Sequence, residues 1–162
     1  MTGVQTCALP ISDRVRAIAD IFASGNFGSV ASDQIIQDMW EKWVFLSSLA
    51  ASTSLMRTSV GNILAAPGGR DFLLGMVDEV SAIAKAGGHE PRGPFAERTR
   101  TMLTTEGSPM TASMFRDIKA GAPVEADHVI GDLIARAEAA KISVPKLRTA
   151  YTHLKAYEKQ RG

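Results

Sequence analysis

Apolar residues recur every three or four positions along most of this chain, and this spacing limits its fold more than any other feature. The pattern is clearest over residues 70–85 and 125–140, where the apolar side chains would share one side of a helix. Glycine and proline interrupt it repeatedly, and such breaks predict helix ends. The breaks are Gly25, 67–69, 87–88, 107–109 and Gly121. The chain is therefore predicted to be all-α and built from several helices.

The same pattern predicts where the individual helices lie. They are expected over residues 12–24, 33–56, 60–64, 70–85, 95–105, 113–120, 125–140 and from Pro145 onward. Ser12 is a candidate N-cap for the first helix, and Pro145 suits the first turn of the last. The stretch from Phe27 to Val30 is the one good strand candidate, and a single strand beside a helix forms no sheet alone.

Charge and hydropathy exclude two classes of partner. The net charge is +1 and the 18 basic residues are scattered, whereas nucleic acids select clustered positive charge. The longest apolar stretch, Trp43 to Met56, contains five Ser or Thr residues. It is also shorter than the roughly 20 residues that cross a bilayer. We therefore expect a cytoplasmic protein that binds neither nucleic acid nor a membrane.

Residues 1–11, MTGVQTCALPI, resemble the translation of a short-read sequencing adapter. We expect this segment to be an artefact and exclude it from reasoning about the fold; the alternative is a natural tail of the same composition. Cys7, the only cysteine, lies within it and so carries no redox or metal information. The natural part of the chain is then expected to begin in the middle of a longer protein.

No complete active site is visible in the sequence. The three histidines, His89, His128 and His153, have no metal-ligand spacing, and no thiol ligand remains once Cys7 is set aside, so no metal site is expected. The run Gly25-Asn26-Phe27-Gly28 does not meet the glycine pattern of dinucleotide-binding loops.

Lys42 is unusual because the residues around it, from Met39 to Leu46, are apolar except for Glu41. A lysine in such a position either extends its ammonium group to water or serves as a catalytic group with a shifted pKa. Glu41 is not expected to pair with it, since adjacent helical residues point to different sides.

A second candidate cluster joins Ser113, Asp117, Glu125 and Asp127 across a Gly-Ala-Pro turn. One interpretation is helix capping, with Ser113 at the start of the short helix. Glu125 and Asp127 would then lie near the positive N-terminal end of the next helix. The other interpretation is a binding site.

Both places resemble the C-terminal domain of ketopantoate reductases (2-dehydropantoate 2-reductases). The first stretch consists of Trp40-Glu-Lys42, Gly61, Pro67-Gly-Gly-Arg70, Glu79 and Gly87-Gly88. The second consists of Ser113-Met-Phe-Arg-Asp117, Gly121, Glu125-Ala-Asp127, Gly131 and Ile142-Ser-Val-Pro145. The resemblance implies a helical substrate domain of the 6-phosphogluconate dehydrogenase C-terminal-like type over residues 33–162. Residues 12–32 would be a βα remnant of a nucleotide-binding Rossmann domain.

The resemblance also implies a reaction. Enzymes of this family use NADPH to reduce ketopantoate to pantoate, on the route to pantothenate and coenzyme A. Lys42 would match the general acid that protonates the carbonyl oxygen, in a closing cleft that lowers its pKa. Ser113 would match a residue that hydrogen-bonds substrate, and Glu125 one that holds a ribose hydroxyl of NADPH. The cofactor would be bound mainly by the missing Rossmann domain, so the chain alone is expected to be inactive.

Three positions depart from the family pattern. The family carries asparagines that contact substrate four, eight and eighteen residues after the lysine, where this chain has Leu46, Ala50 and Val60. An apolar wall cannot satisfy the same hydroxyls and carboxylate. The substrate is therefore ketopantoate, another 2-oxo acid or a bulkier ketone, and a related hydroxyacid dehydrogenase is a further alternative.

A second interpretation assigns the chain to a different class of protein. The chain could be a helical interaction or dimerisation module without chemistry, because an apolar surface must remain where a partner domain is missing. Expected partners are a small 2-oxo acid, the missing Rossmann domain and, as an open option, a second copy in a homodimer.

Overall fold

The computed structural model describes residues 12–25 and 31–161, and every regular element in these ranges is helical. The elements are α1 (Asp13–Ala23), α2 (Ile35–Met56), α3 (Val60–Ala65), α4 (Gly69–Ala86), α5 (Gly93–Leu103), α6 (Ser113–Lys119), a π-helical turn η1 (Asp127–Gly131), α7 (Asp132–Ala139) and α8 (Pro145–Arg161). The all-α prediction is confirmed. The expected strand from Phe27 to Val30 lies outside the described residues, as does the segment 1–11 with Cys7.

The chain divides into two units, residues 1–39 and residues 40–162. In the first unit Ser12 caps α1 as expected, because its hydroxyl accepts a hydrogen bond from the Val15 N–H at 3.4 Å. None of the α1 residues is buried. Its apolar side chains are exposed, and Ile21 shows 68% of its surface.

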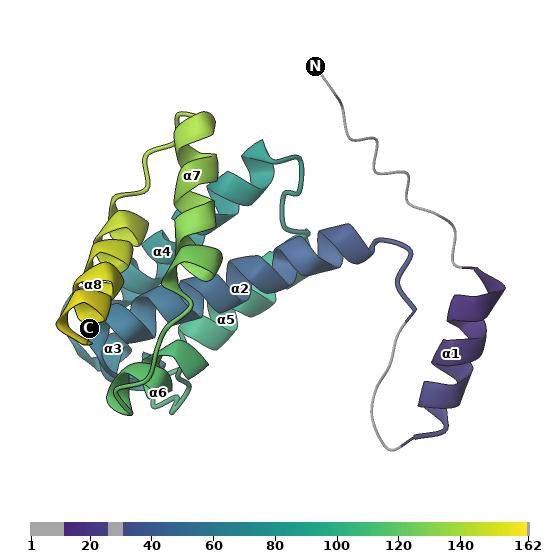
Figure 1. The fold of residues 1–162 in the computed structure, drawn as a ribbon, viewed down its shortest axis with the longest axis horizontal. Helices are drawn as coiled ribbons and strands as arrows, with labels where there is room; N and C mark the ends of the chain where they lie inside the picture. The colour runs from purple at the N-terminus through teal and green to yellow at the C-terminus, as the bar shows by residue number, and fades with distance from the viewer. Residues whose placement is uncertain (1–11, 26–30, 162) are drawn as a thin grey trace. The chain divides into compact units, whose positions relative to one another are not determined.

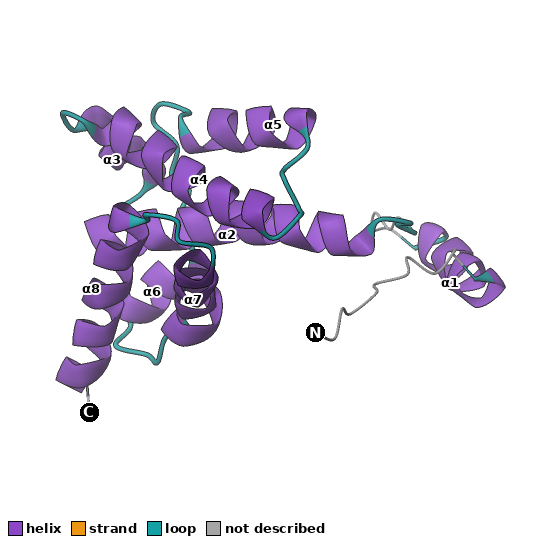
Figure 2. Cartoon of the chain, turned by 90° about the horizontal axis from the view of Figure 1, so that it is seen from above, coloured by secondary structure: helices purple, strands orange, loops and turns teal. Residues whose placement is uncertain are grey.

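The second unit is organised around α2, whose residues from Trp40 onward belong to it. Figure 2 shows α2 passing between α3, α4 and α5 on one side and α6, α7 and α8 on the other. Residues 47–54 are consequently buried on all sides of the helix. The hydroxyls in this stretch are accommodated because they donate to carbonyls one turn earlier, as Ser48 does to Val44 and Thr53 to Leu49.

Two glycines allow close backbone contacts in this unit. A Cβ on Gly61 would lie 2.6 Å from the Ser108 nitrogen, and the Gly61 N–H donates to the Ser108 carbonyl at 2.8 Å. A Cβ on Gly69 would lie 1.7 Å from the Ile63 carbonyl oxygen. Both positions require glycine because the obstructing atoms are main-chain atoms, which cannot swing aside as a side chain can.

The predicted helix over 125–140 differs from expectation in its first turn. Residues 127–131 are π-helical, and the regular helix begins only at Asp132. The carbonyl of Val129 lies within this turn and accepts a hydrogen bond from the Trp43 indole N–H of α2 at 3.0 Å. This bond joins α2 to the π-helical turn.

Two carboxylates, one buried and one largely covered, join segments that are distant in sequence. Glu41 of α2 is 3% exposed and binds both the backbone N–H and the guanidinium of Arg92, at 2.5–2.8 Å. Glu79 of α4 accepts from the backbone N–H groups of Lys146 and Leu147 in the first turn of α8. Figure 1 shows α4 and α8 as neighbours, and this carboxylate links them. Among the described residues, no helix is long and apolar enough to cross a membrane.

Candidate functional site

A pocket of about 400 Å³ opens where α2, α6 and the turn before η1 meet. One wall is apolar and consists of Leu46, Leu49 and Ala50 of α2. The other walls carry polar groups, and Ser113 and Glu125 are among them. The structure therefore brings together two of the three predicted site residues, which are twelve positions apart in the chain.

Ser113 is the first residue of α6, and its hydroxyl does not cap that helix. The N-cap is Ala112, which has no side chain able to accept a hydrogen bond. The Thr53 hydroxyl of α2 instead accepts from the Ala112 N–H at 3.2 Å. The capping interpretation of Ser113 is therefore wrong. Its side chain is exposed at the pocket and makes no hydrogen bond to any described residue.

Glu125 lies at the opposite end of the same turn and is also exposed. Its backbone carbonyl accepts from the Val129 N–H at 3.1 Å, but its carboxylate has no hydrogen-bond or ion-pair partner among the described residues. Ser113 and Glu125 thus line one cavity and make no side-chain hydrogen bond to a described residue. The Ser113 hydroxyl can donate and accept hydrogen bonds, and the two Glu125 oxygens can accept them.

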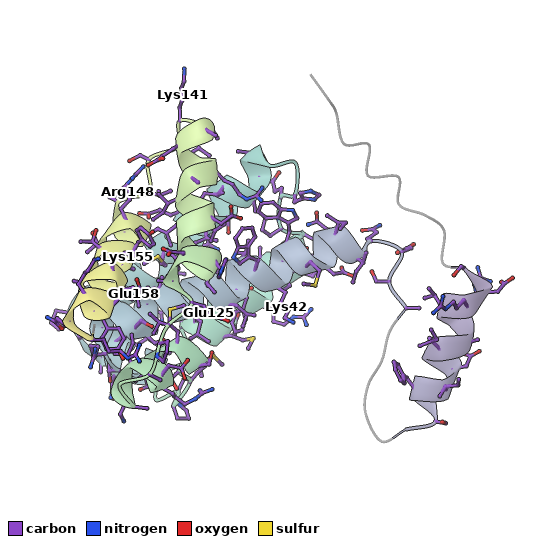
Figure 3. All side chains as sticks on the ribbon, in the orientation of Figure 1. Lys42, Glu125, Lys141, Arg148, Lys155 and Glu158 are labelled. Carbon is purple, nitrogen blue, oxygen red and sulfur yellow. The ribbon has the colours of Figure 1, made fainter. Side chains whose placement is uncertain are left out.

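Lys42 is exposed, so its ammonium group extends to water, the first of the two interpretations drawn from its apolar neighbours. The reason is helix phase: Glu41 and Val44, three residues apart, lie on the side of α2 that faces the core, and Lys42 lies on another side. Figure 3 shows the Lys42 side chain projecting from α2. Lys42 does not line the pocket, but it lies four residues before Leu46, which does. Residues at this spacing share one helix face, so Lys42 stands one turn beyond the rim.

The acidic cluster predicted with Ser113 divides into two places. Asp117 lines the pocket with Glu125. Asp127 does not, because Tyr151 donates to it at 2.6 Å and Lys155 pairs with it at 3.0 Å. The hydrogen bond from Tyr151, followed by that from Lys155, lowers the pKa of Asp127. The hydrogen bond to Asp127 raises the pKa of Tyr151 in return. Asp127 is therefore part of the contact between η1 and α8.

Sequence reasoning assigned no role to Arg116, although the family stretch contains it. Arg116 lines the pocket as a third charged group, and its guanidinium donates to the Thr111 carbonyl at 3.2 Å. The sequence spacing could have predicted that Arg116 lies near Ser113 and Asp117, since residues 113, 116 and 117 lie within about one helical turn. Arg116 is a cation that can attract a carboxylate into the pocket.

The three departures from the family pattern behave differently. Leu46 and Ala50 line the pocket and make its α2 wall apolar. Val60 is fully buried, and its N–H donates to the Met110 carbonyl at 3.0 Å. Two of the three substitutions therefore affect the pocket, while the third belongs to the core.

The histidines lie apart from this pocket. The His89 ring stacks on Trp40 with centroids 5.2 Å apart, His128 is exposed, and burial lowers the pKa of His153. Within residues 12–25 and 31–161, no group of three or more His, Cys, Asp or Glu side chains is arranged to hold a metal ion.

The fold and the pocket define an all-helical domain whose cavity has an apolar wall on the central helix α2 and polar groups on its other walls. Residues 34–158 match the family described as "Ketopantoate reductase PanE/ApbA C terminal". The chain therefore belongs to the ketopantoate reductase family, of which it represents the C-terminal domain. This confirms the resemblance and the fold class predicted from the sequence.

Curated relatives agree with this assignment. The chain is 29% identical over 150 residues to "Uncharacterized oxidoreductase YkpB" of Bacillus subtilis, covering 93% of this chain and 50% of the relative. It is 28% identical over 136 residues to the 2-dehydropantoate 2-reductase of Halobacterium salinarum, covering 84% of this chain and 45% of that enzyme. The chain thus spans about half the length of the curated relatives it matches.

Solved structures share the fold. A dimeric ketopantoate reductase from Staphylococcus aureus has a TM-score of 0.81 at 24% identity, over 93% of this chain and 52% of that one. A D-mandelate dehydrogenase bound to NADH and anilino(oxo)acetate has a TM-score of 0.77 at 15% identity, over 91% of this chain and 62% of that one.

Proposed function

We propose that this chain is the substrate domain of an NADPH-dependent oxidoreductase that reduces ketopantoate or a related 2-oxo acid to the 2-hydroxy acid. The observation that carries the proposal is the convergence of Ser113 and Glu125, both without partners among the described residues, on one pocket beside Lys42. Membership of the ketopantoate reductase family and the oxidoreductases among its relatives support it.

The residues suit the proposed roles chemically. Hydride transfer from NADPH to the carbonyl carbon leaves charge on the oxygen, and the Lys42 ammonium group would supply the proton and stabilise that charge. The Ser113 hydroxyl would hydrogen-bond substrate. The exposed Glu125 carboxylate has the free acceptors that a ribose hydroxyl of the cofactor requires. Arg116 would attract the substrate carboxylate.

The domain plan predicted from the sequence is part of the proposal. Residues 33–162 would form the substrate domain, and residues 12–32 would belong to the nucleotide-binding domain. The exposed large apolar side chains of α1, Val15, Ile18, Ile21 and Phe22, support the second assignment. We also propose that residues 1–11 are an adapter artefact, that the whole protein is cytoplasmic, and that it forms a homodimer, as the Staphylococcus enzyme is described to do.

The test begins with the upstream coding sequence and the full-length protein made from it. Lys42→Ala should lower kcat by about 100-fold or more, the range for loss of a general acid, and leave NADPH affinity nearly unchanged. Lys159→Ala, which removes another exposed lysine, is the control and should leave both quantities unchanged. The 162-residue chain alone should show no NADPH oxidation with ketopantoate. Equal losses of kcat and NADPH affinity in Lys42→Ala would refute the catalytic role.

A second candidate differs in substrate. Leu46 and Ala50 present methyl and methylene groups where the family pattern has amides, which favours a 2-oxo acid with a bulky apolar side chain. The double substitution Leu46→Asn with Ala50→Asn should then raise kcat/KM for ketopantoate and lower it for an aromatic 2-oxo acid such as benzoylformate. If the wild-type enzyme already prefers ketopantoate, this second candidate is wrong and the first stands.

A further inference from the structure

A second cavity, of about 490 Å³, lies where the connection between α2 and α3 meets α6. On the first side it is lined by Arg57, Thr58, Ser59 and Asn62. Arg57 has φ +56°, in the left-handed region that non-glycine residues rarely adopt. Arg57 directly follows the last residue of α2, where a left-handed residue commonly ends a helix, so its conformation fixes where the side chain leaves α2.

The second side of the cavity is one face of α6 and a residue of the loop before it. Thr111, Phe115 and Lys119 line it, spaced four residues apart. Phe115 and Lys119 therefore share one face of α6. The Phe115 ring is buried, and the Lys119 ammonium group lies 5.9 Å from its centroid. This contact directs the cation over an aromatic surface at the edge of the cavity.

The lining of this cavity carries positive charge and no negative charge. Arg57 and Lys119 are its two charged residues, and no carboxylate lines it. Among the described residues, neither cation forms an ion pair or a hydrogen bond. His153 of α8 lies close enough to sense the charge, because Arg57 adds to the effect of burial in lowering the pKa of its imidazole.

The hydroxyl groups of the same lining can donate hydrogen bonds. The Thr58 hydroxyl accepts from the Asn62 amide at 2.8 Å, which leaves its own proton available. The Ser59 hydroxyl accepts from the Asn62 N–H at the start of α3 and likewise keeps its proton. Two cations and two oriented hydroxyls match a tetrahedral dianion, whose oxygens each accept more than one hydrogen bond.

We propose that this cavity, formed by Arg57, Lys119, Thr58 and Ser59, binds the phosphate group of a small phosphorylated metabolite. Its size admits a phosphomonoester larger than free phosphate. It adjoins the Ser113–Glu125 pocket across α6: Phe115 and Lys119 line this cavity, and Ser113, Met114 and Asp117 line the other. Thr111 lines both, so an occupant here would contact the residue that holds Arg116 in the other pocket.

The test uses the 162-residue chain labelled for NMR, with sn-glycerol 3-phosphate as the probe. At constant ionic strength the amide signals of Thr58, Ser59 and Asn62 should shift in a saturable manner. The imidazole of His153 should titrate at a higher pH than in the free chain, because bound negative charge offsets Arg57. Glycerol should produce neither effect. Inorganic phosphate binding as tightly as the ester would show that only the phosphate group is recognised.

Substitutions locate the binding. Arg57→Ala and Lys119→Ala should each weaken the probe about tenfold, the loss expected for one charge-assisted hydrogen bond. Arg57→Lys and Lys119→Arg should retain most of the affinity, and so exclude misfolding as the cause. Arg98→Ala removes an exposed cation of α5 and should have no effect. If Arg98→Ala weakens the probe as much as Arg57→Ala does, or if no shift saturates, the site does not exist.

Discussion

Replacing Glu79 tests how α4 is joined to the first turn of α8. The Glu79 side chain is only 10% exposed, and its two oxygens accept from the backbone N–H groups of Lys146 at 3.1 Å and Leu147 at 2.9 Å. These are two of the N–H groups that the first turn of α8 leaves without an intrahelical partner. A carboxylate from α4 therefore caps α8 and also complements the positive end of its dipole.

The cost of losing this cap follows from the two bonds. In Glu79→Gln, one oxygen is replaced by an amide that faces an N–H donor, and the remaining bond loses its charge. A helix cap contributes about 1 kcal/mol and a bond to a charged group about 1.5–3 kcal/mol. We therefore expect Glu79→Gln to lower the free energy of unfolding by about 2 kcal/mol, and Glu79→Ala by somewhat more.

Urea unfolding followed by circular dichroism measures this loss. With a urea dependence of about 2 kcal/mol per molar, the midpoint for Glu79→Gln should fall by about 1 M. Glu138→Gln is the matched control, because Glu138 is 58% exposed and pairs with Arg148 at the surface. It should change stability by less than about 0.5 kcal/mol. Equal midpoints for the two variants would refute the role of Glu79 as a cap.

Two further predictions concern packing and pH. Gly61→Ala places a methyl group 2.6 Å from the Ser108 backbone and should lower the free energy of unfolding by about 2 kcal/mol or more. Gly93→Ala is the control, because its methyl group meets nothing within 4 Å, and it should cause no such loss. A loss for Gly61→Ala no larger than that for Gly93→Ala would contradict the close contact. Burial lowers the pKa of the His153 imidazole, so on acidification the imidazole binds a proton in the unfolded chain before it does so in the folded chain. The free energy of unfolding should therefore fall as the pH drops below about 6.5 and level off below the pKa of the folded state. His153→Gln should flatten this decline in urea titrations at several pH values, and His128→Gln, at an exposed position, should not.

Local patterns in the sequence were enough to predict most of the helices. The periodicity over 70–85 and Gly87 correspond to α4, and Ser12 and Pro145 mark the starts of α1 and α8. These predictions succeed because helix spacing and helix ends depend on residues only a few positions apart. Ser113 and Glu125 were chosen through the family resemblance, and the structure places both at one pocket.

Only the tertiary structure decided which side chains meet across the domain. It turned Lys42 outward while Glu41, 51 residues from Arg92, became the buried ion-pair partner. It also separated Asp127 from Glu125 by pairing it with Tyr151, 24 residues away. Periodicity records the direction of a side chain relative to its own helix, but it contains no information about which other helix packs there. That choice depends on how all the helices pack around α2, and the sequence pattern alone does not encode it.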